Sequence, residues 1–345
     1  MRKVKRVRVG GLEFGGGRIY VQSMLNVPAE DIEKSVIQAK ALENAGCEII
    51  RAAVPRIEDA ALIAALKNAV SVPIVADIHF DHRIALACVE AGVDKVRINP
   101  GNIGGAENVK AVADACRKKK IPIRIGVNSG SLEKELLDKY GSPTAQALVE
   151  SALNHVKMLS DCDFDDIVIS IKSSNVKLMI EAYRLLAQQT EYPLHLGVTE
   201  AGTERMGLIK SSVGIGSLLC DGIGDTIRVS LTADPINEVY AAKDILKACG
   251  MGCGAEIVSC PTCGRTQIDL ITLANQVEDM LKDVEKPIKV AVMGCAVNGP
   301  GEAREADIGV AGGKGEGLIF AKGEILRKVP ENVILDELKK EIDKL

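Results

Sequence analysis

The stretch from residue 95 to residue 125, KVRINPGNIGGAENVKAVADACRKKKIPIRI, contains one complete structural repeat and the start of the next. It opens with a β-branched run at 95–98, passes through a glycine-rich loop and an alanine-rich helical segment, and returns to a β-branched run at 121–125. Strands that alternate with helical segments of this length are typical of βα units, which build parallel sheets. The stretch therefore predicts the α/β class.

The same unit recurs along the chain as far as about residue 245. Eight β-branched runs begin mostly 22 to 32 residues apart, at 19–21, 48–50, 73–76, 95–98, 121–125, 167–171, 194–198 and 226–230. Eight βα repeats over this length predict a TIM-like (β/α)8 barrel. An open, doubly wound sheet is the alternative arrangement of the same repeats.

Two additions to the barrel are expected. Residues 4–14 read as a pair of strands that turns at Gly10-Gly11 and is placed to plug the bottom of the barrel. The long interval between the fifth and sixth runs holds two helical segments, 131–139 and 143–160, separated by Gly141-Ser142-Pro143. An extra helix is therefore expected in that loop.

The character of the sequence changes near residue 245. A glycine- and cysteine-containing loop leads to a strand at 255–258, a helix at 267–284, strands at 288–292 and 308–310, a glycine run and a charged amphipathic helix at 330–345. These segments predict a small α+β domain. We therefore expect two domains, residues 1–245 and residues 246–345.

Composition restricts the class of protein. Apolar residues make up 47% of the chain, and its net charge is −4. With no Trp, five Tyr and four Phe, the chain offers few platforms for stacking nucleic-acid bases. We read no membrane span and no secretion signal. Ten cysteines without an export signal indicate a reducing compartment, so a cytoplasmic location is expected.

Basic side chains stand at the ends of the predicted strands. The active site of a TIM-like barrel lies at the carboxyl ends of its strands. Five different strands carry a cation there: Arg51, Arg97, Arg124, Lys172 and Arg228. Because like charges repel unless an anion neutralises them, the set predicts a site for a small di- or triphosphate. Taken singly, each is as well explained by a surface salt bridge or a place in a barrel layer.

Uncharged and acidic side chains accompany these cations. Asp77, Asn99 and Asn128 are candidates for orienting the ligand, and Ser230 ends the eighth run. Glu200 is the preferred proton donor, because it is a lone acid beside a basic cavity. A salt bridge between Glu200 and Arg228 is an equally good reading.

Three of the ten thiols stand apart from the others. Cys260 and Cys263 form a C-x2-C turn in the stretch VSCPTCGRT (258–266), and Cys295 opens the stretch GCAVNGPGEA (294–303), which also contains Glu302. Three thiolates and an exchangeable carboxylate suit a 4Fe–4S cluster with one weakly held iron. A zinc site completed by Cys253 and a plain redox dithiol at Cys260 and Cys263 are the alternatives.

Ten motifs together resemble one enzyme family along essentially the whole chain. They are VQSM (21–24), ADIHF (76–80), VRINPGN (96–102), IRIGVNSGSL (123–132), SIKSS (170–174), LGVTEAG (196–202), SSVGIGSLL (211–219), GDTIRVSLT (224–232), SCPTCGRT (259–266) and MGCAVNGPGEA (293–303). The chain resembles the bacterial 4-hydroxy-3-methylbut-2-enyl diphosphate synthases of the methylerythritol phosphate isoprenoid pathway. The last two motifs are the most specific.

The resemblance implies a fold and a reaction. The fold is a (β/α)8 barrel followed by a small α+β iron–sulfur domain like those of sulfite and nitrite reductases. The reaction is the two-electron reductive dehydration and ring opening of 2-C-methyl-D-erythritol 2,4-cyclodiphosphate to 4-hydroxy-3-methylbut-2-enyl diphosphate. Flavodoxin or ferredoxin would supply the electrons, and the enzyme would be a homodimer whose active site is shared between subunits.

The resemblance also assigns roles to residues. It implies a 4Fe–4S cluster bound by Cys260, Cys263, Cys295 and Glu302. It implies that Glu200 is the acid or base and that Asn298 lies near the substrate. It implies a diphosphate site that comprises Arg51, Arg97, Asn99, Arg124, Asn128, Lys172, Arg228 and Ser230.

Two other functions remain open at this point. The barrel could serve as a sensor or scaffold that only binds a phosphorylated metabolite. It could also be a pterin-binding barrel of the dihydropteroate synthase type, although such a barrel has no use for the three thiols. Anaerobic iron and sulfide analysis would separate these readings.

Overall fold

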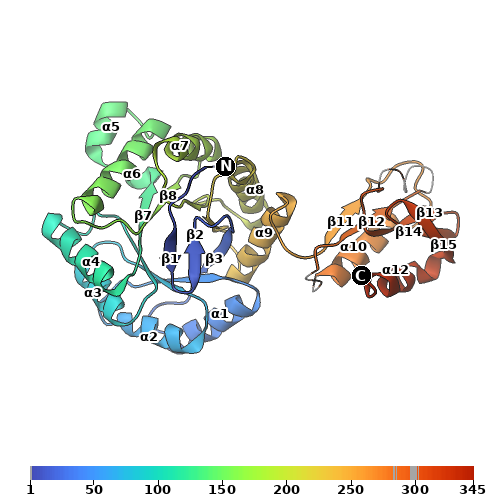
Figure 1. Cartoon of the computed structure of the whole chain (residues 1–345), viewed down its shortest axis with the longest axis horizontal. Helices are drawn as coiled ribbons and strands as arrows, with labels where there is room; N and C mark the ends of the chain where they lie inside the picture. Colours follow the sequence, from blue (N-terminus) through green and yellow to red (C-terminus); the bar gives the residue numbers. More distant parts are fainter. Residues whose placement is uncertain (1, 283, 285, 296–300, 302) are drawn as a thin grey trace. The chain divides into compact units, whose positions relative to one another are not determined.

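The computed structural model describes residues 2–282, 284, 286–295, 301 and 303–345. The chain divides into two compact units, Met1–Gly250 and Met251–Leu345, each of which has its own core (Figure 1). The boundary expected near residue 245 falls within the last helix of the first unit, α9 (Pro235–Ala248). Within the described residues, no helix is long and apolar enough to cross a membrane.

The first unit is a parallel barrel. Its strands follow the order β8-β7-β6-β5-β4-β3-β10-β9, and a parallel bridge between Ile169 and Leu194 joins β8 to β9. That bridge closes the ring, so the TIM-like prediction is confirmed and the open sheet is wrong. The strands are β3 (Tyr20–Met24), β4 (Ile49–Ala53), β5 (Ile74–Asp77), β6 (Lys95–Ile98), β7 (Ile123–Asn128), β8 (Ile167–Lys172), β9 (His195–Leu196) and β10 (Thr226–Ile227).

Helices surround the barrel and cover the outward side chains of its strands (Figure 1). Side-chain caps mark where several of them begin, as where Asp31 accepts a hydrogen bond from Lys34 and Asn175 from Leu178. The helices are α1 (Ile32–Asn44), α2 (Ala60–Ala69), α3 (His82–Glu90), α4 (Ala106–Lys119), α5 (Lys134–Tyr140), α6 (Ala145–Ser160), α7 (Val176–Gln189), α8 (Glu204–Cys220) and α9. The extra helix α5 and the long α6 confirm the insertion predicted after the fifth run.

An N-terminal hairpin closes the bottom of the barrel, as predicted. Strands β1 (Val7–Val9) and β2 (Leu12–Phe14) pair antiparallel across Gly10-Gly11. Phe14 is fully buried, and it packs with residues from the amino-terminal ends of the barrel strands, which are Tyr20, Ile49, Val75 and Val168. The hairpin therefore adds an apolar cluster at the amino-terminal end of the barrel.

The second unit is a five-stranded sheet flanked by helices. The order is β11 (Glu256–Ser259), β12 (Lys289–Met293), β13 (Ile308–Gly313), β14 (Glu316–Ala321) and β15 (Glu324–Pro330), with the first three strands parallel and the last two antiparallel. Helices α10 (Leu270–Leu281) and α12 (Ile334–Ile342) pack on it. The glycine run after residue 310 lies in β13, in β14 and in the turn between them, and the strands β14 and β15 were not predicted from the sequence. Gly309 and Gly317 are strand residues with no room for a side chain, which would meet Phe320 and Ile334.

Candidate functional site

A pocket of about 140 Å³ lies among the carboxyl-terminal ends of the barrel strands. Seven of the predicted site residues line it: Arg51, Asp77, Arg97, Arg124, Asn128, Lys172 and Arg228. The sequence reasoning did not assign to the site the four other lining residues, His79, Gly126, Ser170 and Thr199. The five cations come from β4, β6, β7, β8 and the segment that follows β10. Strand topology thus gathers side chains that are far apart in the sequence.

Asp77 is the one carboxylate among the lining residues, and it holds two of the cations. Its side chain accepts hydrogen bonds from Arg51 and, at 3.2 Å, from Arg97 Nη1. His79 Nε2 lies 3.3 Å from the same carboxylate. Burial opposes ionisation of Asp77, but the charges of Arg51 and Arg97 and the hydrogen bond with His79 hold its pKa well below the usual value. Asp77 is therefore ionised, and both of its carboxylate oxygens already accept hydrogen bonds from neighbouring arginines.

Gly126 makes room for Arg97. A Cβ atom at residue 126 would lie 2.4 Å from Arg97 Nε, so Arg97 would have to move away from its present position. Arg97 Nη2 lies 3.4 Å from the Gly126 carbonyl oxygen, which accepts its hydrogen bond. A glycine inside a strand often marks a close approach of this kind, and this is the signal by which the sequence could have revealed it.

The other three cations of the pocket, Arg124, Lys172 and Arg228, form no ion pair with a carboxylate among the described residues. Arg124 is 1% exposed, and its Nε and Nη1 atoms have no hydrogen-bond partner among the described residues. Burial, and then repulsion from Arg51 and Arg97, lowers the pKa of Arg124 well below its usual value. Burial and Arg228 do the same for the pKa of Lys172, and burial and Arg51 lower the pKa of Arg228 to about 10. A bound anion could accept hydrogen bonds from Arg124, Lys172 and Arg228. It would thereby offset the free-energy cost of burying these three cations.

The remaining predicted residues of the barrel lie outside the pocket lining. Asn99 is buried, and its Oδ1 atom accepts a hydrogen bond at 3.1 Å from the Gly101 amide, which shapes the loop after β6. Ser230 is half-buried. Glu200 is exposed, with a left-handed φ of 50°. Among the described residues no ion pair joins Glu200 to Arg228, so the salt-bridge reading of Glu200 is wrong.

The three predicted cluster thiols follow neighbouring parallel strands of the second unit. Cys260 comes directly after β11, Cys263 is three residues further on, and Cys295 follows β12. The Gly294 amide donates a hydrogen bond to Cys260 Sγ at 3.1 Å. Backbone and side-chain hydrogen bonds from Arg265 lower the pKa of the exposed Cys263 thiol. Amide donors to sulfur and a thiol that ionises readily suit thiolate ligation of an iron–sulfur group.

Two predicted residues, Asn298 and Glu302, lie outside the described residues. Across the described ranges, no three His, Cys, Asp or Glu side chains converge closely enough to hold a metal ion. All ten cysteines are free thiols. The donor chemistry at the ends of β11 and β12 therefore fits the predicted cluster, and its geometry is not described.

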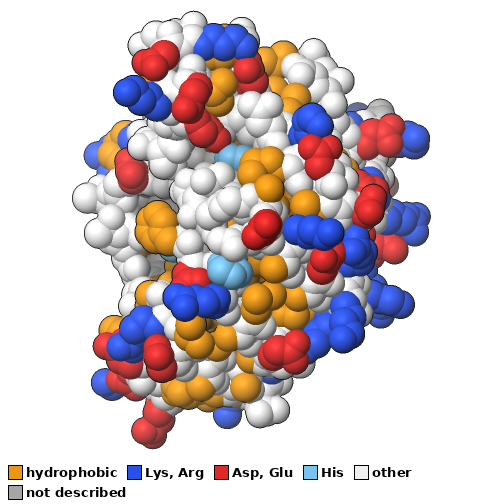
Figure 2. All heavy atoms as spheres, turned by 90° about the vertical axis from the view of Figure 1, so that its left-hand side faces the viewer, with side chains coloured by type: hydrophobic (Ala, Val, Ile, Leu, Met, Phe, Trp, Pro, Cys, Tyr) orange, Lys and Arg blue, Asp and Glu red, His pale blue; other side chains and the backbone are white. Residues whose placement is uncertain are grey.

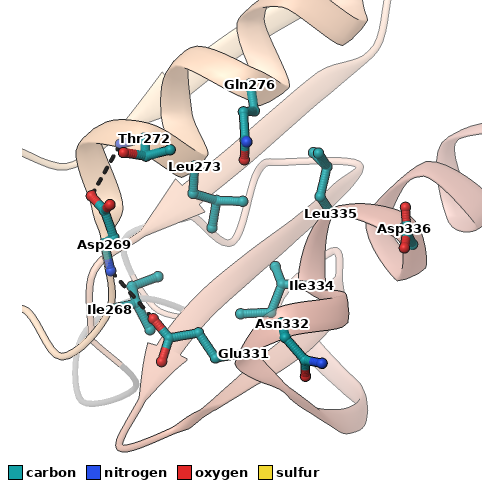
Figure 3. Close-up of a pocket in the computed structure, with 10 residues that line it drawn as sticks. All are labelled: Ile268, Asp269, Thr272, Leu273, Gln276, Glu331, Asn332, Ile334, Leu335 and Asp336. Carbon is teal, nitrogen blue, oxygen red and sulfur yellow. Dashed lines mark hydrogen bonds between the residues drawn. The ribbon is translucent and has the colours of Figure 1, made fainter.

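The second unit contains another cavity, of about 290 Å³ (Figure 3). Asp269 begins α10 by accepting a hydrogen bond from the Thr272 amide at 3.2 Å, and its own amide lies 3.4 Å from Glu331, which accepts in turn. The rest of the lining mixes apolar and polar side chains and includes one more carboxylate: Ile268, Leu273, Gln276, Asn332, Ile334, Leu335 and Asp336. Its three carboxylates would repel an anion, so this cavity does not compete with the basic pocket.

Comparison with known families matches both units. The model of the GcpE TIM-barrel domain matches residues 4–243, and the model of the GcpE protein C-terminal domain matches residues 256–344. A protein of Clostridium perfringens named 4-hydroxy-3-methylbut-2-en-1-yl diphosphate synthase (flavodoxin) is 60% identical over 344 residues, which is 99% of each chain. A protein of the same name from Clostridium acetobutylicum is 59% identical over 345 residues and also covers 99% of each chain.

Two solved dihydropteroate synthases match about 70% of this chain. Dihydropteroate synthase from Xanthomonas albilineans has a TM-score of 0.53 at 17% identity, and the match covers 70% of this chain and 96% of the other. The enzyme from Stenotrophomonas maltophilia gives a TM-score of 0.53 at 16% identity over the same shares. At this level of identity the likeness shows the barrel fold and nothing about the ligand.

Proposed function

We propose that this chain, which belongs to the GcpE family of 4-hydroxy-3-methylbut-2-en-1-yl diphosphate synthases, reduces 2-C-methyl-D-erythritol 2,4-cyclodiphosphate to 4-hydroxy-3-methylbut-2-enyl diphosphate. The reaction opens the cyclic diphosphate and removes one hydroxyl group as water, and it consumes two electrons and two protons. The single observation that carries the proposal is the pocket of five cations around one carboxylate.

The pocket suits the substrate in charge and in geometry. Arg124 and Arg228 have unpartnered nitrogen atoms among the described residues, and Lys172 forms no ion pair there. Arg51 and Arg97, by contrast, are already held by Asp77. We propose that Arg124, Lys172 and Arg228 bind the phosphate oxygens. We propose that Asp77, with the bound Arg51 and Arg97, forms the side of the pocket that the substrate contacts. Asn128 adds an amide that can orient the ring, and Asn99 and Ser230 shape the loops beside it.

The electron-transfer group is proposed on the donor chemistry of the second unit. Cys260, Cys263, Cys295 and Glu302 would hold a 4Fe–4S cluster. When bound, that cluster would pass electrons one at a time to the substrate. Asn298 is proposed to lie close to the substrate, and Glu200 to deliver a proton to the departing hydroxyl group.

Flavodoxin is the proposed electron donor, because the names of both relatives include it, and ferredoxin would be chemically equivalent. A homodimer with shared active sites is proposed from the family resemblance alone. We also propose a cytoplasmic location, where the ten free thiols would remain reduced.

Anaerobic purification followed by iron and sulfide analysis tests the cluster, with electron paramagnetic resonance before and after substrate. Turnover is measured by 31P nuclear magnetic resonance, with dithionite and then with reduced flavodoxin. We expect four iron and four sulfide per chain in the fully loaded protein, and conversion of the cyclodiphosphate. Zinc without sulfide, or a cyclodiphosphate that binds and stays intact, would overturn the proposal.

A matched pair of variants locates the cluster. Cys263→Ser should lose iron and all turnover, because it removes one of the proposed thiolate ligands. Cys220→Ser replaces another exposed thiol, at the end of α8, and should keep both. Equal iron content in the two variants would show that the proposed ligands are wrong.

A further inference from the structure

Glu238 is a buried carboxylate outside the pocket lining, and the mechanism proposed above makes no use of it. It lies in the first turn of α9 and is 6% exposed. Asp234 caps this helix by accepting a hydrogen bond from the Ile236 amide at 2.9 Å. Helix α9 packs against β3 (Figure 1). A carboxylate buried in this way is stable only when hydrogen bonds compensate for the lost water.

Both oxygen atoms of Glu238 accept hydrogen bonds, and the donors come from two different elements of the barrel. The Leu231 amide donates to Oε1 at 2.9 Å, and the Ser23 hydroxyl donates to Oε2 at 3.2 Å. Ser23 is a fully buried residue of β3, whereas Leu231 lies in the segment that follows β10. Glu238 therefore links this segment to β3.

The link lies beyond the point where regular sheet pairing stops. Strands β3 and β10 pair in parallel as far as Val21 and Ile227. Past Ile227, the acceptor for the Leu231 amide is the Glu238 carboxylate and not a carbonyl of β3. Hydrogen bonds from an amide to a carboxylate are stronger than those to a neutral acceptor. A side chain thus continues the connection that the sheet no longer provides.

The segment held by Glu238 carries one of the pocket cations. Arg228 lines the pocket and precedes Leu231 by three residues. Its Nη1 atom lies 3.6 Å from Met24 Sδ, and Met24 follows Ser23 in β3. The two hydrogen-bond donors of Glu238 therefore belong to the two chain segments between which the Arg228 side chain lies.

The charge of Glu238 also suits Arg228. Burial and Arg51 lower the pKa of Arg228, and Glu238 acts in the opposite direction by favouring the charged guanidinium. The Nε atom of Arg228 has no hydrogen-bond partner among the described residues. Because the oxygens of Glu238 are taken by other donors, it offsets the charge of Arg228 and leaves that atom available to a ligand.

We propose that Glu238 is a positioning residue of the pocket: its carboxylate fixes the segment 228–231 against β3 and thereby directs Arg228 toward a bound diphosphate group. The inference rests on the proposed function for the identity of the substrate, whereas inorganic diphosphate tests it without that identity. Removing the carboxylate would break the hydrogen bonds from Leu231 and Ser23 and release the segment.

Two substitutions of similar size separate hydrogen bonding from packing. Glu238→Met keeps the length of the side chain and removes both acceptors. Glu238→Gln keeps one acceptor oxygen for the Leu231 amide, and its amide group can donate to the Ser23 hydroxyl. Glu181→Met, an exposed change in α7, is the matched control. Circular dichroism and thermal unfolding check the folding of each variant.

Amide hydrogen exchange followed by mass spectrometry reports on the segment without any ligand. Glu238→Met should raise the exchange rate of peptides that cover residues 228–232 about tenfold, as for the loss of one hydrogen bond to a charged group. Glu238→Gln and the control should exchange like the unsubstituted protein. An unchanged rate in Glu238→Met would overturn the proposal, and so would an equal rise in the Met and Gln variants.

Calorimetric titration of the full-length protein with inorganic diphosphate measures the effect on the pocket. We expect Glu238→Met to weaken binding about tenfold and Glu238→Gln to stay within about threefold. Added to Arg228→Met, Glu238→Met should weaken binding less than about twofold further, because its effect passes through Arg228. A full additional tenfold loss in the double variant, or equal affinities of Glu238→Met and the control, would overturn the proposal.

Kinetics supply an independent readout. In the reduced holoenzyme, Glu238→Met should raise KM for the cyclodiphosphate and leave kcat nearly unchanged, because the proposed cluster ligands are untouched. A lower kcat at unchanged KM would contradict a role in directing Arg228. If the unsubstituted protein binds diphosphate but shows no turnover, the proposed function fails, whereas hydrogen exchange and titration still decide the role of Glu238.

Discussion

At the scale of single residues, the pocket concentrates positive charge that the rest of the chain does not reveal. The net charge is −4, and the face of the molecule in Figure 2 shows acidic and basic side chains intermixed. The pocket, by contrast, sets five cations against Asp77. Buried charges of one sign are costly without a partner, so the arrangement stores free energy that a bound anion releases.

Gly126 provides a sharp test at this scale. Gly126→Ala should displace Arg97, because the new Cβ would lie 2.4 Å from its Nε atom. Displacing Arg97 should also disturb Asp77, which holds it at 3.2 Å. We expect diphosphate affinity to fall about tenfold, as for the loss of one charged hydrogen bond, measured by calorimetric titration.

The matched control is Gly130→Ala in the loop after β7, where a Cβ would meet nothing within 4 Å. It should bind diphosphate like the unsubstituted protein. Equal affinities of the two alanine variants would mean that Arg97 is not held by the space at Gly126.

At the scale of elements, polar contacts hold the insertion between β7 and β8 together, and Glu133 makes the most buried of them. Glu133 precedes α5, and its carboxylate lies 2.9 Å from His155 Nε2 and 2.9 Å from Ser151 Oγ, both on α6. Partial burial opposes its ionisation, but the hydrogen bonds from His155 and Ser151 prevail and lower the pKa of Glu133 to about 2. This contact ties the extra helix to the barrel.

Glu133→Gln should therefore destabilise the protein in a pH-dependent way. Because the folded-state pKa is depressed, the stabilisation is complete above the unfolded value near 4.5 and is lost as the pH falls toward about 2. Allowing for solvent screening, we expect a loss of about 1 kcal/mol at pH 7, measured by urea denaturation. The difference from the unsubstituted protein should shrink progressively below pH 4.5.

Glu135→Gln, an exposed change within α5, is the control and should have little effect at any pH. If Glu133→Gln lowered the free energy of unfolding by the same amount at every pH, the contact would stabilise the protein by packing and not by charge.

The same scale shows where sequence patterns misled. The segment 316–330 forms the hairpin β14–β15, whereas the sequence pattern predicted no strands between the glycine run and the last helix. Gly317 is in fact required by the close approach of Ile334 from α12. Local composition could not reveal a contact made by a helix that follows later in the chain.

At the scale of the whole molecule, the two units have separate cores and separate cavities. Units with their own cores commonly unfold as separate cooperative transitions. We expect calorimetry to resolve two transitions and diphosphate to shift only the barrel transition upward. At one hundred times its Kd, diphosphate should stabilise the barrel by about 2.7 kcal/mol.

Sodium chloride at matched ionic strength is the control for this experiment. It should shift neither transition appreciably, because four of the five pocket cations are buried and therefore poorly screened by salt. A diphosphate-induced shift of equal size in both transitions would show that the anion binds elsewhere or that the units are coupled.

The βα repeat, the barrel class, the N-terminal hairpin and the family could all be predicted from the amino-acid sequence. Each of these depends on short-range periodicity or on motifs that are contiguous in the chain. The sequence also identified all five pocket cations, because parallel topology brings the ends of successive strands together.

Only the tertiary structure decided how those cations are held. Asp77 binds both Arg51 and Arg97, and Gly126 leaves the space that Arg97 occupies. The bridge between Ile169 and Leu194 closes the barrel, and Lys95 is buried without a hydrogen-bond partner among the described residues. All of these features depend on residues from different strands. The physical reason is that burial and Coulomb interactions depend on distances in space. Those distances join residues that the chain separates, so no local pattern contains them.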